Sequence, residues 1–303
     1  MDVYMSVQEM IGSTPMLKLN HLGVKEGVNL YAKLELMNPA GSVKDRVGMY
    51  MVKDAEDKGL LKPGSTIVEA TAGNTGIGIA IAALNRGYRV IFAVPEKFSI
   101  EKQKVMKALG AEIIHTSREG GMKGAEKKAN ELLKEIPDSI SLGQFHNPMN
   151  PFSHYQTTGP EIFKQLDGQV DYLVAGAGSG GTFSGVVKFL KEKNKNIQGV
   201  LADPYGSIIG GGEHGDYNIE GIGNDFIADT MDVSLIDKVF KVTDDEAFEA
   251  CRTLASHEGI LAGSSSGAAL TAALKLAEEI DHGNIVVIFP DRGDRYLSKD
   301  LFV

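Results

Sequence analysis

The stretch Thr66-Ile67-Val68-Glu69-Ala70-Thr71-Ala72-Gly73-Asn74-Thr75-Gly76 joins three kinds of local sequence. A short apolar run rich in β-branched residues comes first, then a polar loop with glycine, then the start of an apolar helical pattern. The run predicts a buried strand over Thr66–Glu69, and the pattern from Gly76 to Leu84 predicts a helix. A strand that leads through a loop into a helix is the unit from which parallel sheets are built, so the stretch predicts an α/β fold.

The same succession recurs along most of the chain. Further strands are expected at residues 89–94, 112–115, 172–175 and 285–289, and further helices at residues 45–58, 100–109, 124–134, 181–191, 244–257 and 266–280. Continuous apolar strands that alternate with helices predict parallel sheets covered on both faces. We therefore expect two doubly wound α/β domains with twisted, mostly parallel sheets, residues 1–146 and residues 147–303.

Composition limits the classes of function. The 303 residues are 43% hydrophobic and 23% charged, as in ordinary soluble globular proteins. The net charge of −9 disfavours nucleic acid as a partner, and no apolar run approaches the ~18 residues of a membrane span. Cys251 is the only cysteine, and it lies in a helical pattern that predicts a core position. No internal disulfide, no cysteine-rich metal site and no signal peptide are expected, which favours the cytoplasm.

Lys44 lies in Asn38-Pro39-Ala40-Gly41-Ser42-Val43-Lys44-Asp45-Arg46, a turn that leads into an amphipathic helix. The partial positive charge at a helix N-terminus lowers the cost of deprotonating a lysine there. A neutral amine can attack an aldehyde, so the position suits a Schiff base with pyridoxal phosphate. The local sequence also fits a surface lysine at the start of a helix.

Three loops carry further chemistry, each before a predicted helix. The loop Thr71–Thr75 predicts a site for an anion such as a carboxylate, although a capped turn has the same composition. The loop Gly176–Thr182 predicts a phosphate site, because backbone amides can close around oxygen atoms where side chains are absent. It matches neither a Walker loop nor a dinucleotide fingerprint, which favours a single phosphate. In Ala262–Gly267, Ser265 can hydrogen-bond a heterocyclic nitrogen, and Ser266 suits a helix cap.

These motifs, in this order, resemble the fold-type II pyridoxal-phosphate enzymes of the cysteine synthase and cystathionine β-synthase family. The resemblance runs from Ile11-Gly12-Ser13-Thr14-Pro15 to Arg295-Tyr296-Leu297-Ser298. It implies the tryptophan synthase β-like fold, in which residues about 13–36 cross over to the second domain. It also implies three groups of site residues: the substrate carboxylate loop Thr71, Ala72, Gly73, Asn74 and Thr75 with Gln144; the phosphate loop Gly178, Ser179, Gly180, Gly181 and Thr182; and the cofactor contacts Lys44, Asn74 and Ser265.

The resemblance implies β-replacement on serine, O-acetylserine or cysteine through an aminoacrylate. Lys44 is then both the Schiff-base anchor and the base for the α-proton, while Asn74 bonds the ring hydroxyl and Ser265 faces the pyridine nitrogen. A thiol or sulfide is the second substrate, and the product is cysteine or a thioether. The expected assembly is a homodimer, with serine acetyltransferase as a candidate partner.

Three positions separate this chain from the common pattern of the family. Ala72 replaces a serine and so affects substrate preference, and it resembles enzymes that use O-acetylserine with homocysteine. Asp225 either acts on a second amino group, on water or on a thiol, or only caps its loop. Arg292 replaces a serine; a surface charge is favoured, and the alternative is a position at the ring end of the cofactor, where it would change the electronics of the pyridine.

Three other functions are considered. The first is release of hydrogen sulfide from cysteine, with formation of lanthionine or serine. The second is a deaminating dehydratase, which the thiol-using loop matches disfavour. The third, from a different class, is a catalytically silent protein that binds an amino acid or a peptide, which the presence of Lys44 disfavours.

Overall fold

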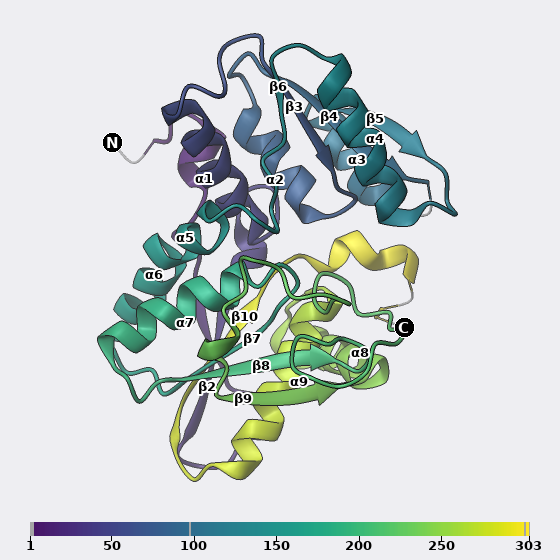
Figure 1. Ribbon diagram of the computed structural model, residues 1–303. Coiled ribbons are helices and arrows are strands. Elements are labelled where there is room, and N and C mark those ends of the chain that lie inside the picture. Colours follow the sequence, from purple (N-terminus) through teal and green to yellow (C-terminus); the bar gives the residue numbers. More distant parts are fainter. Residues whose placement is uncertain (1–2, 97, 300, 303) are drawn as a thin grey trace. The chain divides into compact units, whose positions relative to one another are not determined.

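The computed structural model describes residues 3–96, 98–299 and 301–302 (Figure 1). The chain divides into two compact units. Unit 1 contains the residues up to Ile11 together with Lys44–Met149, and unit 2 contains Gly12–Val43 together with the residues from Asn150 onward. The predicted α/β class with mostly parallel sheets is confirmed.

Unit 1 is built on a parallel sheet in the strand order β5-β4-β3-β6. Its strands are β3 (Thr66–Ala70), β4 (Arg89–Pro95), β5 (Glu112–Thr116) and β6 (Ser139–Ile140). Its helices are α1 (Lys44–Asp57), α2 (Asn74–Ala83), α3 (Ile100–Ala108) and α4 (Gly121–Glu135), with a 3-10 turn at Val7–Met10. Val68 and Ile91 of the sheet pack against Ala129 of α4. Helix α2 is buried along its length after Asn74 and packs against α1.

Unit 2 is built on a sheet in the strand order β1-β2-β10-β7-β8-β9, in which only the β1–β2 pair is antiparallel among the described strands. Its strands are β1 (Met16–Leu19), β2 (Val28–Leu34), β7 (Tyr172–Gly176), β8 (Gln198–Pro204), β9 (Lys238–Val242) and β10 (Gly283–Phe289). Its helices are α5 (Met149–Gln156, whose first residue belongs to unit 1), α6 (Thr158–Gln165), α7 (Gly181–Lys193), α8 (Asp244–Thr253) and α9 (Ser264–Glu279). Short helical turns lie at Glu35–Met37, Val233–Leu235, Leu254–Glu258 and Gly293–Lys299.

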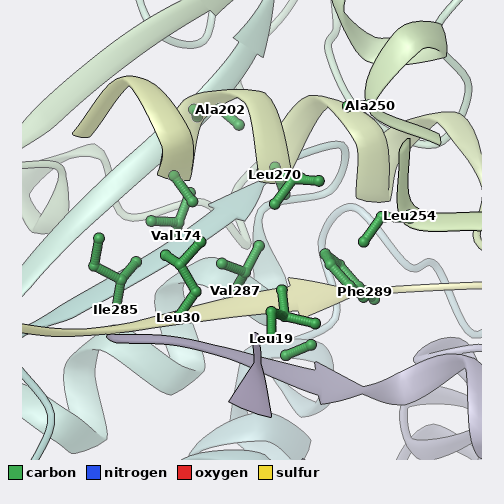
Figure 2. Packing of buried hydrophobic residues seen from close by; sticks show 14 of the residues in the cluster. Leu19, Leu30, Val174, Ala202, Ala250, Leu254, Leu270, Ile285, Val287 and Phe289 are labelled. Atoms are coloured by element: carbon green, nitrogen blue, oxygen red, sulfur yellow. The ribbon is translucent and has the colours of Figure 1, made fainter. Parts of the chain in front are cut away.

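Alternate residues of the central strands in unit 2 enter two separate cores. Val174 and Val287 lie with Leu270 of α9 in one core, as Figure 2 shows. The neighbouring residues Leu173 and Val286 lie in the other core with residues of α7. Because successive side chains of a strand point to opposite faces, helices cover both sides of this sheet. Loops that follow the strands then gather at their carboxyl ends, where ligands bind in such folds.

The described part of the chain contains no helix with both the length and the apolar character needed to cross a bilayer.

Candidate active site

Lys44 is the first residue of α1 and is partly buried. Its backbone lies against α2, because a Cβ added to Gly78 would come within 2.2 Å of the Lys44 carbonyl oxygen. Gly48, one turn later in α1, has the same kind of contact, since its Cβ would lie 2.1 Å from the Gly78 oxygen. The absence of side chains at these two glycines therefore fixes Lys44 against the helix that the carboxylate loop opens.

The loop predicted to bind a carboxylate runs from the end of β3 to the start of α2. Thr71 N–H donates to the Ala93 oxygen at 3.3 Å, and the Thr71 hydroxyl accepts from Gly73 N–H at 3.5 Å. Thr75 donates from Oγ1 to Oε1 of Gln144 at 2.5 Å. The structure therefore places Gln144 beside the loop to which the sequence assigned it. The first amide groups of α2 have no acceptor within the helix, so they can bind an anion.

Glu69 is a site-supporting residue that the sequence analysis missed. Its Oε1 accepts hydrogen bonds from the Ser141 hydroxyl at 2.9 Å, from Gly143 N–H at 2.8 Å and from Leu142 N–H. Burial raises the pKa of Glu69, while these hydrogen bonds act in the opposite direction. A carboxylate within an apolar strand was the available signal, but its partners lie far along the chain.

The predicted phosphate loop follows β7 and ends at the N-terminus of α7. A Cβ at Gly178 would lie 2.6 Å from the Gly221 oxygen, so only glycine fits there. The Ser179 hydroxyl accepts from Nδ2 of Asn150 at 2.9 Å, and Oγ1 of Thr182 lies 3.2 Å from Nε2 of His154. The side chains of Ser179 and Thr182 are thus held in place at a helix start whose amides suit an anion.

The loop before Asp225 packs against the phosphate loop. Gly223 N–H donates to the Ala177 oxygen at 2.7 Å, and Nδ2 of Asn224 donates to the Gly178 oxygen at 2.8 Å. Asp225 itself is exposed and makes no hydrogen bond within residues 3–96, 98–299 and 301–302. Sequence reasoning singled out Asp225 but missed Asn224, which holds the two loops together.

Ser265 lies in the first turn of α9 and is 3% exposed. A Cβ on Gly221 would lie 4.0 Å from its Oγ, which places Ser265 beside the same loop. Its hydroxyl can act as both a hydrogen-bond donor and an acceptor. A buried hydroxyl of this kind fits a ligand that supplies an acceptor or donor, such as a ring nitrogen.

The other two sequence positions of interest lie as follows. Ala72 is buried within the carboxylate loop. Arg292 is exposed, and its Nε donates to the Leu36 oxygen at 3.0 Å. The predicted core position of Cys251 is confirmed, since its side chain is buried.

Each unit, taken by itself, has groups that suit part of pyridoxal phosphate. In unit 2, a helix N-terminus with a glycine loop suits the phosphate, and the buried Ser265 hydroxyl suits the ring nitrogen. In unit 1, Lys44 supplies an amine at the start of α1, and Asn74 of the carboxylate loop is the first residue of α2. The groups of unit 2 suit an anionic heterocycle, and those of unit 1 suit an aldehyde and a carboxylate.

Comparison with known proteins also points to a pyridoxal-phosphate enzyme. The family described as pyridoxal-phosphate dependent enzyme matches residues 7–291. An O-acetylserine dependent cystathionine beta-synthase of Bacillus subtilis is 53% identical over 303 residues, which cover 100% of this chain and 99% of that protein.

Two solved structures have the same fold. An O-acetylserine dependent cystathionine beta-synthase from Helicobacter pylori has a TM-score of 0.95 at 45% identity and covers 100% of both chains. A hydrogen sulfide-producing enzyme from Fusobacterium nucleatum has a TM-score of 0.93 at 40% identity, over 97% of this chain and 100% of that one. Motifs, fold and relatives agree, and the chain belongs to the family of pyridoxal-phosphate dependent enzymes.

Proposed function

We propose that the protein catalyses β-replacement on O-acetylserine, with the thiol of homocysteine as the preferred nucleophile and a thioether as the product. The observation that carries this proposal is the 53% identity, over the whole chain, to an O-acetylserine dependent cystathionine beta-synthase. Ala72 in the carboxylate loop supports the same branch of the family, because it resembles the loop of enzymes with this pair of substrates.

Pyridoxal phosphate, when bound, supplies an electron sink that makes the α-proton of an amino acid acidic. Lys44 holds the cofactor through its amine, and the same Nζ removes the substrate's α-proton and later returns it. Residues Gly178–Thr182 bind the phosphate, and Ser265 bonds the ring nitrogen. Because a serine hydroxyl is neutral, it does not keep that nitrogen charged as a carboxylate would.

The carboxylate loop orients the amino-acid substrate. The amides at the start of α2 bind the carboxylate, and Thr75 and Gln144 add side-chain hydrogen bonds. Asn74 bonds the ring hydroxyl of the cofactor. A substrate held at its carboxylate presents its α-proton to the Lys44 amine in one orientation, which is the main contribution of such a clamp.

The experiment offers the purified protein O-acetylserine with sulfide, cysteine and homocysteine at equal concentrations, and identifies the products by mass spectrometry. Cystathionine with an equal amount of acetate is the expected main product. Cysteine as the main product would contradict the preference for homocysteine. Release of no acetate with any thiol would contradict β-replacement altogether and would favour a silent binding protein.

The likeness to the hydrogen sulfide-producing enzyme favours one second activity, release of sulfide from cysteine. Incubation with cysteine alone tests it, because lanthionine or serine should then form with one sulfide for each cysteine consumed at its β-carbon. A protein that forms cystathionine from O-acetylserine but releases no sulfide from cysteine would exclude this alternative.

Asp225 is the residue we assign to recognition of the thiol substrate. Its carboxylate is exposed, and the neighbouring Asn224 is fixed to the phosphate loop at 2.8 Å. A carboxylate suits the amino group of homocysteine, which sulfide lacks. Asp225→Asn should therefore raise KM for homocysteine and leave KM for sulfide unchanged, whereas Asp216→Asn, at another exposed loop position, should change neither. Equal effects on both thiols would contradict the assignment.

We further infer that the protein acts as a homodimer in the cytoplasm, with serine acetyltransferase as a partner. Resemblance to the cysteine synthase family supports these points. Sedimentation should give twice the 32.5 kDa of the chain. Co-sedimentation with serine acetyltransferase tests the second interaction, and a monomer or a lack of co-sedimentation would contradict the respective inference.

A further inference from the structure

Loop 141–144, which carries Gln144, is attached to the sheet of unit 1 through one carboxylate oxygen. Oε1 of Glu69 accepts from the Ser141 hydroxyl, Leu142 N–H and Gly143 N–H, while Glu69 is only 9% exposed. These donors lie more than seventy residues along the chain from Glu69, directly after β6, which ends at Ile140. The carboxylate therefore continues, at the end of β3, the attachment that the β3–β6 ladder provides up to Ile140.

An open pocket borders this loop. A pocket of about 300 Å³ is lined by Ser141, Leu142 and Gly143 and, from α1, by Met51 and Ala55. Side chains that border an open space lose contacts that a filled core would provide. The hydrogen bonds to Glu69 join this loop to the end of β3, in addition to the burial of Leu142.

The residue after this anchored segment is Gln144, whose Oε1 accepts from Thr75 at 2.5 Å. A glutamine amide has an oxygen that accepts, as it does here from Thr75, and an N–H₂ group that can donate to a carboxylate. A shift of the loop would move this amide relative to the start of α2. Such a shift would weaken substrate binding without changing the groups that perform proton transfer.

We propose that Glu69 is the positioning residue of the substrate carboxylate site, acting through loop 141–144 on Gln144. The inference rests on the proposed function, because it assumes that Thr75 and Gln144 bind the carboxylate of the amino acid. Beyond that function, the proposal states that Glu69 affects KM for the amino acid without contacting it, and that KM for the thiol does not depend on Glu69.

The test compares Glu69→Ala with Glu69→Gln in steady-state assays of the holoenzyme. Glu69→Ala removes the acceptor and should raise KM for O-acetylserine about tenfold, with kcat and KM for the thiol unchanged. Glu69→Gln keeps an amide oxygen at the position of Oε1 and should restore KM for O-acetylserine. Ser141→Ala removes one of the three donors and should raise that KM by a smaller factor, which provides the test if Glu69→Ala does not fold.

Glu56→Ala is the matched control. Glu56 also accepts several hydrogen bonds in unit 1, from Arg86 at 2.7 and 2.9 Å and from Tyr88 at 2.9 Å, but it has no bond to loop 141–144. It should lower thermal stability and leave KM unchanged. An unchanged KM in Glu69→Ala, an equal loss in Glu69→Gln, or a loss of cofactor in place of a KM effect would overturn the inference. Inactivity of the wild-type enzyme with every thiol would instead contradict the proposed function.

Discussion

Thr75 and Gln144 lie 69 residues apart in the sequence, and a hydrogen bond of 2.5 Å joins their side chains. The two residues belong to different segments. Thr75 lies in the first turn of α2, and Gln144 is the last residue of loop 141–144, which is hydrogen-bonded to Glu69. The proposed carboxylate site is thus formed by two chain segments, and the position of each residue depends on that of the other. Residues coupled in this way should not behave independently when mutated.

A double-mutant cycle tests that coupling. Thr75→Val and Gln144→Ala should each raise KM for the amino acid, while the double variant should fall short of the sum by about 1 kcal/mol. Thr75→Ser keeps the hydroxyl and serves as the control with nearly normal KM. Strict additivity of the two changes would show that the hydrogen bond does not contribute to binding.

Local chemistry was sufficient to select some of these residues from the sequence. Lys44, Asn74 and Thr182 lie in glycine-containing loops at helix starts, and that pattern is visible within a few residues. Glu69 and Asn224 could not be assigned in this way, because their partners come from distant segments. The roles of the selected residues remain predictions until they are tested by mutation.

At the scale of elements, the contact between α1 and α2 determines where Lys44 lies. Gly78 and Gly48 allow the two backbones to approach so closely that a Cβ at Gly78 would lie 2.2 Å from the Lys44 oxygen. The partner atom is backbone, so the clash cannot be relieved by rotating a side chain. The position of α1, and with it that of Lys44, therefore depends on glycine at residues 48 and 78.

Gly78→Ala should force α1 and α2 apart. We expect a loss of about 2–3 kcal/mol in the free energy of unfolding, together with weaker cofactor retention, because overpacking displaces the backbone. Gly124→Ala in α4 is the control: its Cβ would meet nothing within 4 Å, so a gain of about 0.5–1 kcal/mol is expected. Denaturant titration and cofactor absorbance measure both effects. Normal stability in Gly78→Ala would contradict the close contact.

Five strands were predicted from their apolar runs, whereas β1, β2, β6, β8 and β9 were not. Strands β3, β4, β5, β7 and β10 were expected within two residues of their observed bounds. Strand β1 was missed because it is short and half of its residues are exposed, and β9 because two lysines interrupt its apolar residues. The expected helix over residues 244–257 ends as an α-helix at Thr253 and continues as a π-helical turn. The change from α-helix to π-helix does not alter the spacing of the apolar residues enough to be predicted from the sequence.

At the scale of the whole molecule, the segment Gly12–Val43 joins the unit formed by the C-terminal half. Strand β2 pairs in parallel with β10, with Val28 opposite Gly283, and so adds an N-terminal segment to the sheet of unit 2. Pairing between strands so far apart in sequence is not encoded in any local pattern. We propose that units 1 and 2 are the two domains expected from the sequence, with this segment as the crossover.

Cys251 provides a probe of unit 2 in the intact protein. Its thiol is buried and donates to the Gly263 oxygen at 3.4 Å, and burial raises the pKa of Cys251 to about 12. The thiolate is the reactive form, so the native protein should resist thiol reagents near pH ~8 and react only as the pH approaches that raised value. One thiol should react in denaturant. Rapid labelling of the native protein near neutral pH would show that the core around α8 and α9 opens readily.

The central claim is that Lys44 holds pyridoxal phosphate in this enzyme. Borohydride reduction of the purified holoenzyme fixes a lysine–cofactor bond permanently, and peptide mapping by mass spectrometry then locates the modified lysine. The account predicts one pyridoxyl group for each chain, on the peptide that contains Lys44, and none on the Lys44→Ala variant. A modification on a different lysine, or no modification of a protein supplied with the cofactor, would contradict it.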